Sequence, residues 1–310
     1  MANVAIAKII DVMKSDNAVP AQAVDAEART AIIAGNGLLP MVVAEALAAK
    51  GNPPFVLCLK GEADEALHKY DHAVVSILEF TRLIRALKQS GAKNVVLAGG
   101  VRKRPNLSDI RLDFTTLRAL PRVFRALGQG DDALLRAFIG LLETYGFHMV
   151  GAHQIVPDIL APAPSVLTNT KPDKKERHNI VLASQAAALL GTLDVGQGAV
   201  AVGGRVVALE GVEGTDNMLK RVRQMRDEGR IPRHGGVLVK CAKPTQDERA
   251  DLPAIGIDTV TNIAAAGLAG IAIEAGRTVM LSYHDTVQAA DAQGLFIVTF
   301  DSPSGASTDV

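Results

Sequence analysis

The stretch R-T-A-I-I-A-G-N-G-L-L-P-M-V-V-A-E-A-L-A-A-K, residues 29–50, decides the fold. Its first six residues form a short apolar run, which stops at Gly35-Asn36-Gly37, and a helical pattern rich in Ala and Leu follows from about Pro40. A strand, a glycine-rich turn and a helix are the outline of a phosphate-binding βα turn. The third glycine of the dinucleotide fingerprint is missing, so a plain tight turn explains the pattern equally well. Gly35, Asn36 and Gly37 are candidate substrate-binding residues.

More apolar runs follow at residues 55–59, 73–77, 94–98 and 147–150, with helical patterns between them. This alternation predicts an α/β fold whose first domain is a Rossmann-like, doubly wound parallel sheet. The run at 94–98 ends in Gly99-Gly100 and leads to Arg102-Lys103-Arg104, which suits either an anion site or a solvated basic turn. We include Arg104 among the candidate substrate-binding residues.

The domain boundary is predicted where the composition changes. Pro157, Pro162 and Pro164 fall within eight residues, and such clusters mark loops. We therefore expect an N-terminal extension (1–28), a Rossmann-like domain (29–156) and a second, mixed α/β domain (157–310). The extension has helical apolar spacing but lacks the features of a signal peptide. The sequence has no run of about 18 apolar residues, so we expect no membrane-spanning helix.

Two helix beginnings carry carboxylates. Asp131-Asp132 precedes a helix expected at 133–145, where an acidic residue is usually an N-cap. Glu213-Gly214-Thr215-Asp216 opens a helix expected at 217–226. Thr215 or Asp216 could again be only a cap, but Glu213 and Asp216 are also suitable oxygen ligands for Mg²⁺. Thr215 is a candidate substrate-binding residue.

The rest of the second half predicts a hairpin, several strands and a polar loop. Residues 199–202 and 205–209 are apolar runs separated by Gly203-Gly204, a hairpin signal. Gln197, in the D-V-G-Q-G run before the hairpin, is a candidate substrate-binding residue. Residues 168–178 are polar and are expected to form an exposed loop before a helix at 179–190.

The densest run of charge is K-C-A-K-P-T-Q-D-E-R-A-D-L-P-A-I-G, residues 240–256. Charge runs are usually solvated loops. Here, however, both signs of charge are interleaved, and the run lies between an apolar strand (237–239) and an apolar segment, where α/β proteins place their sites. It therefore predicts a loop that holds a charged ligand. Its candidate residues are Lys240, Lys243, Gln246, Asp247 and Asp251.

The composition excludes several classes of protein. Lys plus Arg and Asp plus Glu both number 33, and aromatic residues make up 4% with no Trp. A neutral chain with few aromatics offers neither a basic footprint nor stacking platforms, so we expect no nucleic-acid partner. The only cysteines, Cys58 and Cys241, form no C-x-x-C motif, which excludes a thiolate zinc site and fits a reduced cytosolic setting.

Several short runs, taken in order, resemble the LpxI family of UDP-2,3-diacylglucosamine pyrophosphatases. The resemblance covers nearly the whole chain after the extension. It differs in places, with Thr245 where the family often has Gly and Ala254 where it often has Thr. The runs that carry it are I-A-G-N-G-L-L-P (33–40), G-D-D-A-L-L-R (130–136), G-A-H-Q-I-V-P-D-I-L-A-P (151–162), D-V-G-Q-G-A-V (194–200), E-G-T-D-N-M-L (213–219), K-P-T-Q-D-E-R-A-D-L-P-A-I-G (243–256) and A-G-L-A-G-I-A-I-E-A-G (266–276).

The resemblance implies a reaction and a central residue. The family hydrolyses the pyrophosphate of UDP-2,3-diacylglucosamine to UMP and 2,3-diacylglucosamine 1-phosphate (lipid X), a step of lipid A biosynthesis. The reaction needs Mg²⁺ or another divalent cation such as Mn²⁺, and the substrate lies in a cleft between two domains. The family's essential aspartate lies in the R-x-D-L-P run and matches Asp251, which we expect to act in catalysis and at the metal, with Asp216 and Glu213 as further metal candidates.

The lipid-linked nucleotide-sugar substrate also implies a place in the cell. Because it carries two acyl chains, the enzyme is expected to be cytoplasmic and peripheral at the inner-membrane surface. The sequence leaves the oligomeric state open, a homodimer included. Two other functions stay open as well: a nucleotide-dependent oxidoreductase, and a protein that binds a nucleotide-sugar lipid without turnover.

Overall fold

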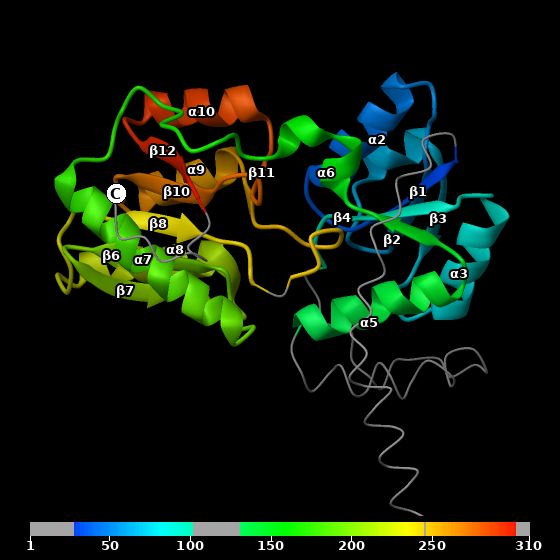
Figure 1. Ribbon diagram of the computed structural model, residues 1–310, viewed down its shortest axis with the longest axis horizontal. Coiled ribbons are helices and arrows are strands. Elements are labelled where there is room, and N and C mark those ends of the chain that lie inside the picture. The colour runs from blue at the N-terminus through cyan, green and yellow to red at the C-terminus, as the bar shows by residue number, and fades with distance from the viewer. Residues whose placement is uncertain (1–27, 102–130, 245, 302–310) are drawn as a thin grey trace, which may run out of the picture.

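The computed structural model describes residues 28–101, 131–244 and 246–301. The chain forms two lobes that lie side by side, and the segment after strand β8 crosses from the second lobe to the first (Figure 1). Most of the extension and Arg104 lie outside the described residues, so the expectations for them stay predictions. No helix in the described ranges is long and apolar enough to span a bilayer.

The first lobe is built on a five-stranded parallel sheet with the order β3-β2-β1-β4-β5. Its central strands are buried on both faces and read as continuous apolar runs, as parallel sheets require. The strands are β1 (Thr30–Ala34), β2 (Phe55–Leu59), β3 (Asp71–Val75), β4 (Asn94–Ala98) and β5 (His148–Val150).

Helices cover both faces of this sheet, so the prediction of a doubly wound parallel sheet is confirmed. One face packs against α3 (Phe80–Gln89) and α5 (Asp131–Thr144). The opposite face packs against α2 (Leu39–Ala49), α6 (Ala152–Ile155) and the 3₁₀ turns η1 (Glu65–Lys69) and η3 (Pro157–Ile159).

The second lobe has a mixed sheet with the order β12-β10-β8-β6-β7. β12 (Phe296–Phe300), β10 (Gly270–Glu274) and β8 (Val237–Lys240) run parallel, whereas β6 (Gly198–Val202) is antiparallel to both β8 and β7 (Arg205–Leu209). The predicted hairpin is confirmed, because Gly203 and Gly204 both have positive φ angles, 59° and 76°, and join β6 to β7.

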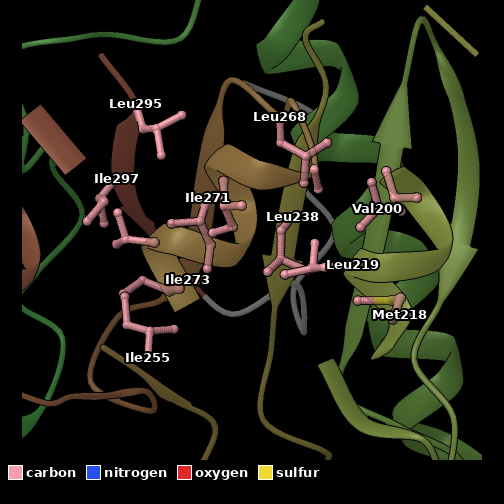
Figure 2. Close-up of a cluster of buried hydrophobic side chains, with 14 of the residues drawn as sticks. Val200, Met218, Leu219, Leu238, Ile255, Leu268, Ile271, Ile273, Leu295 and Ile297 are labelled. Carbon is pink, nitrogen blue, oxygen red and sulfur yellow. The ribbon is translucent and has the colours of Figure 1, made fainter. Parts of the chain in front are cut away.

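Helices also cover both faces of this sheet. α7 (Lys174–Thr192) packs on one face. α8 (Gly214–Asp227), α9 (Ile257–Ala265) and α10 (Tyr283–Ala292) enclose the other. Figure 2 shows this second core, in which Leu238 of the central strand β8 lies close to Leu219 of α8.

A short two-stranded sheet connects the lobes. Strands β9 (Ala254–Ile255) and β11 (Val279–Met280) pair with each other, and Val279 also bridges to Leu160. Val279, Leu252 and Ala254 pack into the apolar cluster that covers the α2 face of the first sheet. The end of the charged loop is therefore anchored in the first lobe.

The structure corrects several predicted boundaries. The polar stretch 168–178 is not all loop, because α7 begins at Lys174, where the side chain of Asp173 accepts a hydrogen bond from the Glu176 N–H at 2.8 Å. β3 begins two residues earlier than expected. The very short elements β9, β11, α6, η1 and η3 were missed, because two to five residues carry too little periodicity to be read.

Candidate functional site

The charged loop leaves the second sheet at the carboxyl end of β8. Gly198, which begins β6, pairs with Lys240, which ends β8. The Cys241 N–H then donates to the Gln197 carbonyl oxygen at 3.0 Å. Lys240 is only 6% exposed, and its ammonium donates to the carbonyl of Ala254 at 3.0 Å. Lys240 therefore ties the first residue of the loop to its far end.

Gln246 connects two of the charged residues that the sequence singled out in the loop, Lys243 and Asp251. Its side-chain oxygen accepts from the Lys243 N–H at 2.9 Å, and its amide nitrogen donates to Oδ2 of Asp251 at 2.7 Å. Gln246 is 8% exposed, so these bonds form with little competition from water. The Asp251 N–H donates to the Asp247 carbonyl at 3.2 Å. The turn therefore fixes both the backbone and the carboxylate of Asp251.

The Asp251 side chain is open to solvent while protein surrounds it on its other sides. The residue is exposed, so a ligand can reach it. The surrounding chain nevertheless raises the pKa of its carboxyl by desolvation, an effect that the charges of Lys243 and Lys240 oppose. Accessibility and a perturbed pKa together are typical of a functional carboxylate.

Lys243 is held by a carboxylate from the neighbouring loop. Its ammonium lies 2.5 Å from Oδ1 of Asp194, and the two side chains are 12% and 21% exposed. Asp194 has a positive φ of 53°, which Asp tolerates better than most residues. Its other oxygen accepts from the Asp132 N–H at 3.3 Å, so this carboxylate connects the second lobe to α5 of the first.

α5 contacts the charged loop at two points. Near its beginning, the Asp132 carboxylate pairs with Arg136 at 3.0 Å and accepts a hydrogen bond from the backbone of Asp247. Near its end, Glu143 accepts from Arg249 at 2.9 Å. Arg249 also forms a two-pronged pair with Asp247, which raises the pKa of the Arg249 guanidinium and lowers that of the Asp247 carboxyl. In Figure 1 the segment after β8 approaches α5.

A second polar cluster lies beside Gln197. Glu210 is 7% exposed, accepts from the Thr215 hydroxyl at 2.7 Å and lies against Gly196 and Gly198. Its Oε2 and the side-chain oxygen of Gln197 are buried and form no hydrogen bond within the described structure. The cluster thus presents unused acceptors next to the start of β6.

The glycine turn of the first lobe is tightly packed. A Cβ on Gly35 would lie 2.2 Å from the Gly100 carbonyl oxygen, so only glycine fits there. Asn36 donates to Glu62 at 3.1 Å and to the Gly100 carbonyl at 2.8 Å. These contacts lie at the carboxyl ends of β1 and β4, where α/β proteins bind ligands.

Comparison with known proteins assigns the family. The LpxI N-terminal domain model matches residues 29–159, and the LpxI C-terminal domain model matches residues 163–298. The chain belongs to the LpxI family. It is 40% identical over 272 residues to the UDP-2,3-diacylglucosamine pyrophosphatase LpxI of Caulobacter vibrioides, covering 87% of this chain and 96% of that protein. The family resemblance seen in the sequence is confirmed.

The structure brings together only part of the predicted LpxI site. Lys240, Lys243, Gln246, Asp247 and Asp251 lie in one bonded loop. Gln197 contacts its first residues, and Thr215 joins Glu210 nearby. The carboxylates of Glu213 and Asp216 have partners of their own: Glu213 pairs with Arg221, and Asp216 accepts from Asn262 at 2.8 Å.

The described residues contain no metal centre made of several side chains. In the ranges that the structure describes, no three His, Cys, Asp or Glu side chains lie close enough together to hold a metal ion. Mg²⁺ commonly takes only one or two carboxylates and completes its shell with phosphate oxygens and water. The accessible Asp251 carboxylate, with Asp132 electrostatically coupled to it, fits that pattern.

Sequence reasoning missed the partners that position this LpxI loop. Asp132 was interpreted as a helix cap, Asp194 as part of a glycine-rich turn, and Arg249 and Glu210 were not assigned. Asp132 and Asp194 both lie in runs that carried the family resemblance, so that signal could have indicated them. Their mutual contact spans 62 residues of sequence, and no local pattern shows it.

Proposed function

We propose that this chain hydrolyses the pyrophosphate bond of UDP-2,3-diacylglucosamine, releasing UMP and 2,3-diacylglucosamine 1-phosphate for lipid A biosynthesis. The observation that carries the proposal is the hydrogen-bonded loop that holds Asp251 open to solvent beside Lys243. Family membership supports it, because the Caulobacter relative is named for this substrate. Phosphoryl-type transfer asks mainly for positioning and for neutralisation of charge, and this loop offers both.

Each residue of the loop has a role in this proposal. Asp251 accepts a proton from, or orients, the water that attacks phosphorus, since it is an accessible carboxylate held by Gln246. Lys243 neutralises charge on the phosphates. Lys240, whose ammonium is bonded to Ala254, contributes by fixing the loop rather than by meeting the substrate.

The reaction is proposed to use Mg²⁺ or Mn²⁺. Asp251 is the carboxylate best placed to hold the ion, with the remaining ligands coming from substrate and water. A bound divalent cation would supply positive charge to the pyrophosphate oxygens. Glu213 and Asp216 are secondary candidates, because their present partners Arg221 and Asn262 would have to release them.

The substrate is proposed to lie in a cleft between the lobes. The parallel sheet of the first lobe supports this, because Gly35, Asn36 and Gly37 follow the carboxyl end of β1 and form the kind of turn that takes a nucleotide phosphate. In the second lobe, Gln197 and Thr215 offer polar groups for the sugar or the base. The unused acceptor on Gln197 suits a donor such as a ring N–H or a hydroxyl.

The membrane-facing surface is proposed to be an apolar patch beside the loop. Leu189, Leu193, Val195 and Val212 are 68%, 74%, 50% and 82% exposed. Leu193 and Val195 flank Asp194, the partner of Lys243, and the adjoining Gly196 packs against the backbone of Glu210, near Val212. Exposed aliphatic side chains next to a site for a diacylated substrate fit a cytoplasmic enzyme that is peripheral at the inner membrane.

Vesicle binding tests this surface. Leu193→Ser should lower the fraction of protein that sediments with liposomes of inner-membrane lipids. Ile77→Ser should not, since Ile77 is also exposed, at 39%, but lies in the first lobe. Equal binding by both variants would reject the patch. Whether the chain forms a homodimer is a separate prediction that analytical ultracentrifugation decides.

The decisive assay incubates the purified chain with UDP-2,3-diacylglucosamine and measures UMP. Release with Mg²⁺ and none with EDTA supports the metal-dependent hydrolase. UMP release that EDTA does not affect would support hydrolysis but contradict the dependence on a metal ion. Binding without release indicates a nucleotide-sugar-lipid binding protein, and consumption of a nicotinamide cofactor would indicate the oxidoreductase.

A further inference from the structure

Asp132 is a buried acidic residue that the proposed chemistry does not yet use. It is 6% exposed, and it lies at the beginning of α5 in the first lobe. Burial raises the pKa of its carboxyl, whereas the positive charges of Arg136 and Lys243 act in the opposite direction. Burying a carboxylate costs free energy unless partners compensate its charge. The partners of Asp132 therefore indicate its role.

The contacts of Asp132 reach both ends of the charged loop. Its N–H donates to Asp194, whose other oxygen holds the Lys243 ammonium. Its carboxylate accepts from the backbone of Asp247. The Asp247 carbonyl in turn accepts from the N–H groups of Ala250 and Asp251, at 2.9 and 3.2 Å. One residue of the first lobe is therefore two hydrogen bonds away from the Asp251 backbone and from the Lys243 ammonium.

The same helix provides a comparison. Glu143 lies eleven residues later, about three helical turns, and therefore on the same side of α5 as Asp132. It also bonds the loop, but through the tip of Arg249, and its side chain is 36% exposed. Asp132 interacts electrostatically with Asp251. Glu143 instead contacts Arg249, and Arg249 would keep its pair with Asp247 if Glu143 were lost.

We propose that Asp132 is a positioning residue for hydrolysis: from the first lobe, it fixes Asp247 and Asp194 and thereby sets where Asp251 and Lys243 meet the substrate. The inference rests on the proposed function and extends it, because the geometry of the charged loop would then depend on a residue of the first lobe. A displacement of about 1 Å in a reacting group can cost about 100-fold in rate. Loss of the Asp132 carboxylate leaves the backbone bond to Asp194 in place but frees Asp247. It is therefore expected to lower kcat far more than it raises KM.

The test compares Asp132→Ala, Asp132→Asn and the control Glu143→Gln. Steady-state kinetics with Mg²⁺ should show kcat about 100-fold lower for the alanine variant, with KM changed less than about threefold. The asparagine variant keeps an acceptor oxygen for the Asp247 N–H and should recover part of the loss. Glu143→Gln weakens another long-range contact of α5, because it removes the charge that pairs with Arg249, and should keep kcat within about threefold of wild type.

Hydrogen exchange reports the positioning without any turnover. In the alanine variant, the amides of Ala250 and Asp251 should exchange faster, while strands β1 and β8 keep wild-type protection and show that the chain is folded. These amides should stay protected in Glu143→Gln. Unchanged exchange at Ala250 and Asp251 overturns the proposal, as does a kcat loss in Glu143→Gln equal to that in Asp132→Ala. A wild-type chain that releases no UMP refutes the proposed function instead, and the exchange experiment still decides the role of Asp132.

Discussion

Gln246→Glu changes one terminal group in the loop that carries Asp251. The substitution keeps the oxygen that accepts from the Lys243 N–H, but it replaces the amide that donates to Asp251 at 2.7 Å with an oxygen. The backbone contact of the loop is thus retained while the carboxylate loses its partner. A change this local separates the orientation of Asp251 from the folding of the loop.

The expected loss follows from the bond that disappears. A hydrogen bond to a charged group contributes about 1.5–3 kcal/mol, which corresponds to about 10- to 150-fold in rate if the bond is needed throughout the reaction. Two carboxylates at this distance cannot both ionise easily. The pKa of Asp251, already raised by burial, should rise further, so the acidic limb of the activity profile should move to higher pH.

The assay measures kcat/KM for UMP release between pH 5 and 9 with saturating Mg²⁺. Gln224→Glu is the matched control, because Gln224 donates to Glu228 at 2.8 Å on the exposed surface of α8, and the same change there should leave the profile unaltered. A Gln246→Glu enzyme with wild-type kcat/KM at every pH would refute the assignment of Asp251. Equal losses in both variants would attribute the effect to added charge alone.

Three further predictions follow. Desolvation raises the pKa of the Asp251 carboxyl, so the acidic limb of wild-type kcat/KM should lie above 3.8, the ordinary value of an aspartate; a limb at or below 3.8 contradicts this effect. Gly35→Ala should lower the free energy of unfolding by about 2–3 kcal/mol, because the new Cβ meets the Gly100 carbonyl, while Gly140→Ala, with open space around it on α5, should be neutral or stabilising in the same denaturant titration. Burial lowers the pKa of the His153 imidazole from 6.5, so on acidification the unfolded chain takes up the proton at a higher pH than the folded chain. The free energy of unfolding should therefore fall as the pH drops below 6.5 towards the folded pKa. His153→Gln should flatten that part of the plot of stability against pH, and a variant that loses stability as wild type does would exclude His153 as the cause.

The sequence was a good guide to the parts of the fold with long, regular patterns. Apolar runs such as residues 94–98 became strands with the expected bounds, and Gly203-Gly204 formed the expected hairpin. The helix expected at 179–190 begins earlier, at Lys174. This start was missed because polar side chains dominate the first turn, although the cap, Asp173, is visible in the sequence. β9 and β11 have two residues each and exist only because they pair across 25 residues of chain.

The site was predictable only one segment at a time. The mixed charges of residues 240–256 indicated the loop, and the family resemblance selected Asp251. Which charges pair could not be read, because the partners come from distant segments: Lys243 binds Asp194, and Arg249 binds Glu143. The proposed metal pair Glu213 and Asp216 shows the same limit, since Arg221 and Asn262 hold those carboxylates in contacts that their spacing does not reveal.

The most direct test of the central claim is the turnover of Asp251→Asn. The substitution keeps the size of the side chain and an oxygen that can accept from Gln246, but it removes the negative charge that would receive a proton or hold a cation. UMP release from UDP-2,3-diacylglucosamine with Mg²⁺ should fall to less than a few per cent of wild type, with substrate binding and thermal stability retained. A variant that keeps more activity than that would show that the reaction does not depend on the Asp251 carboxylate.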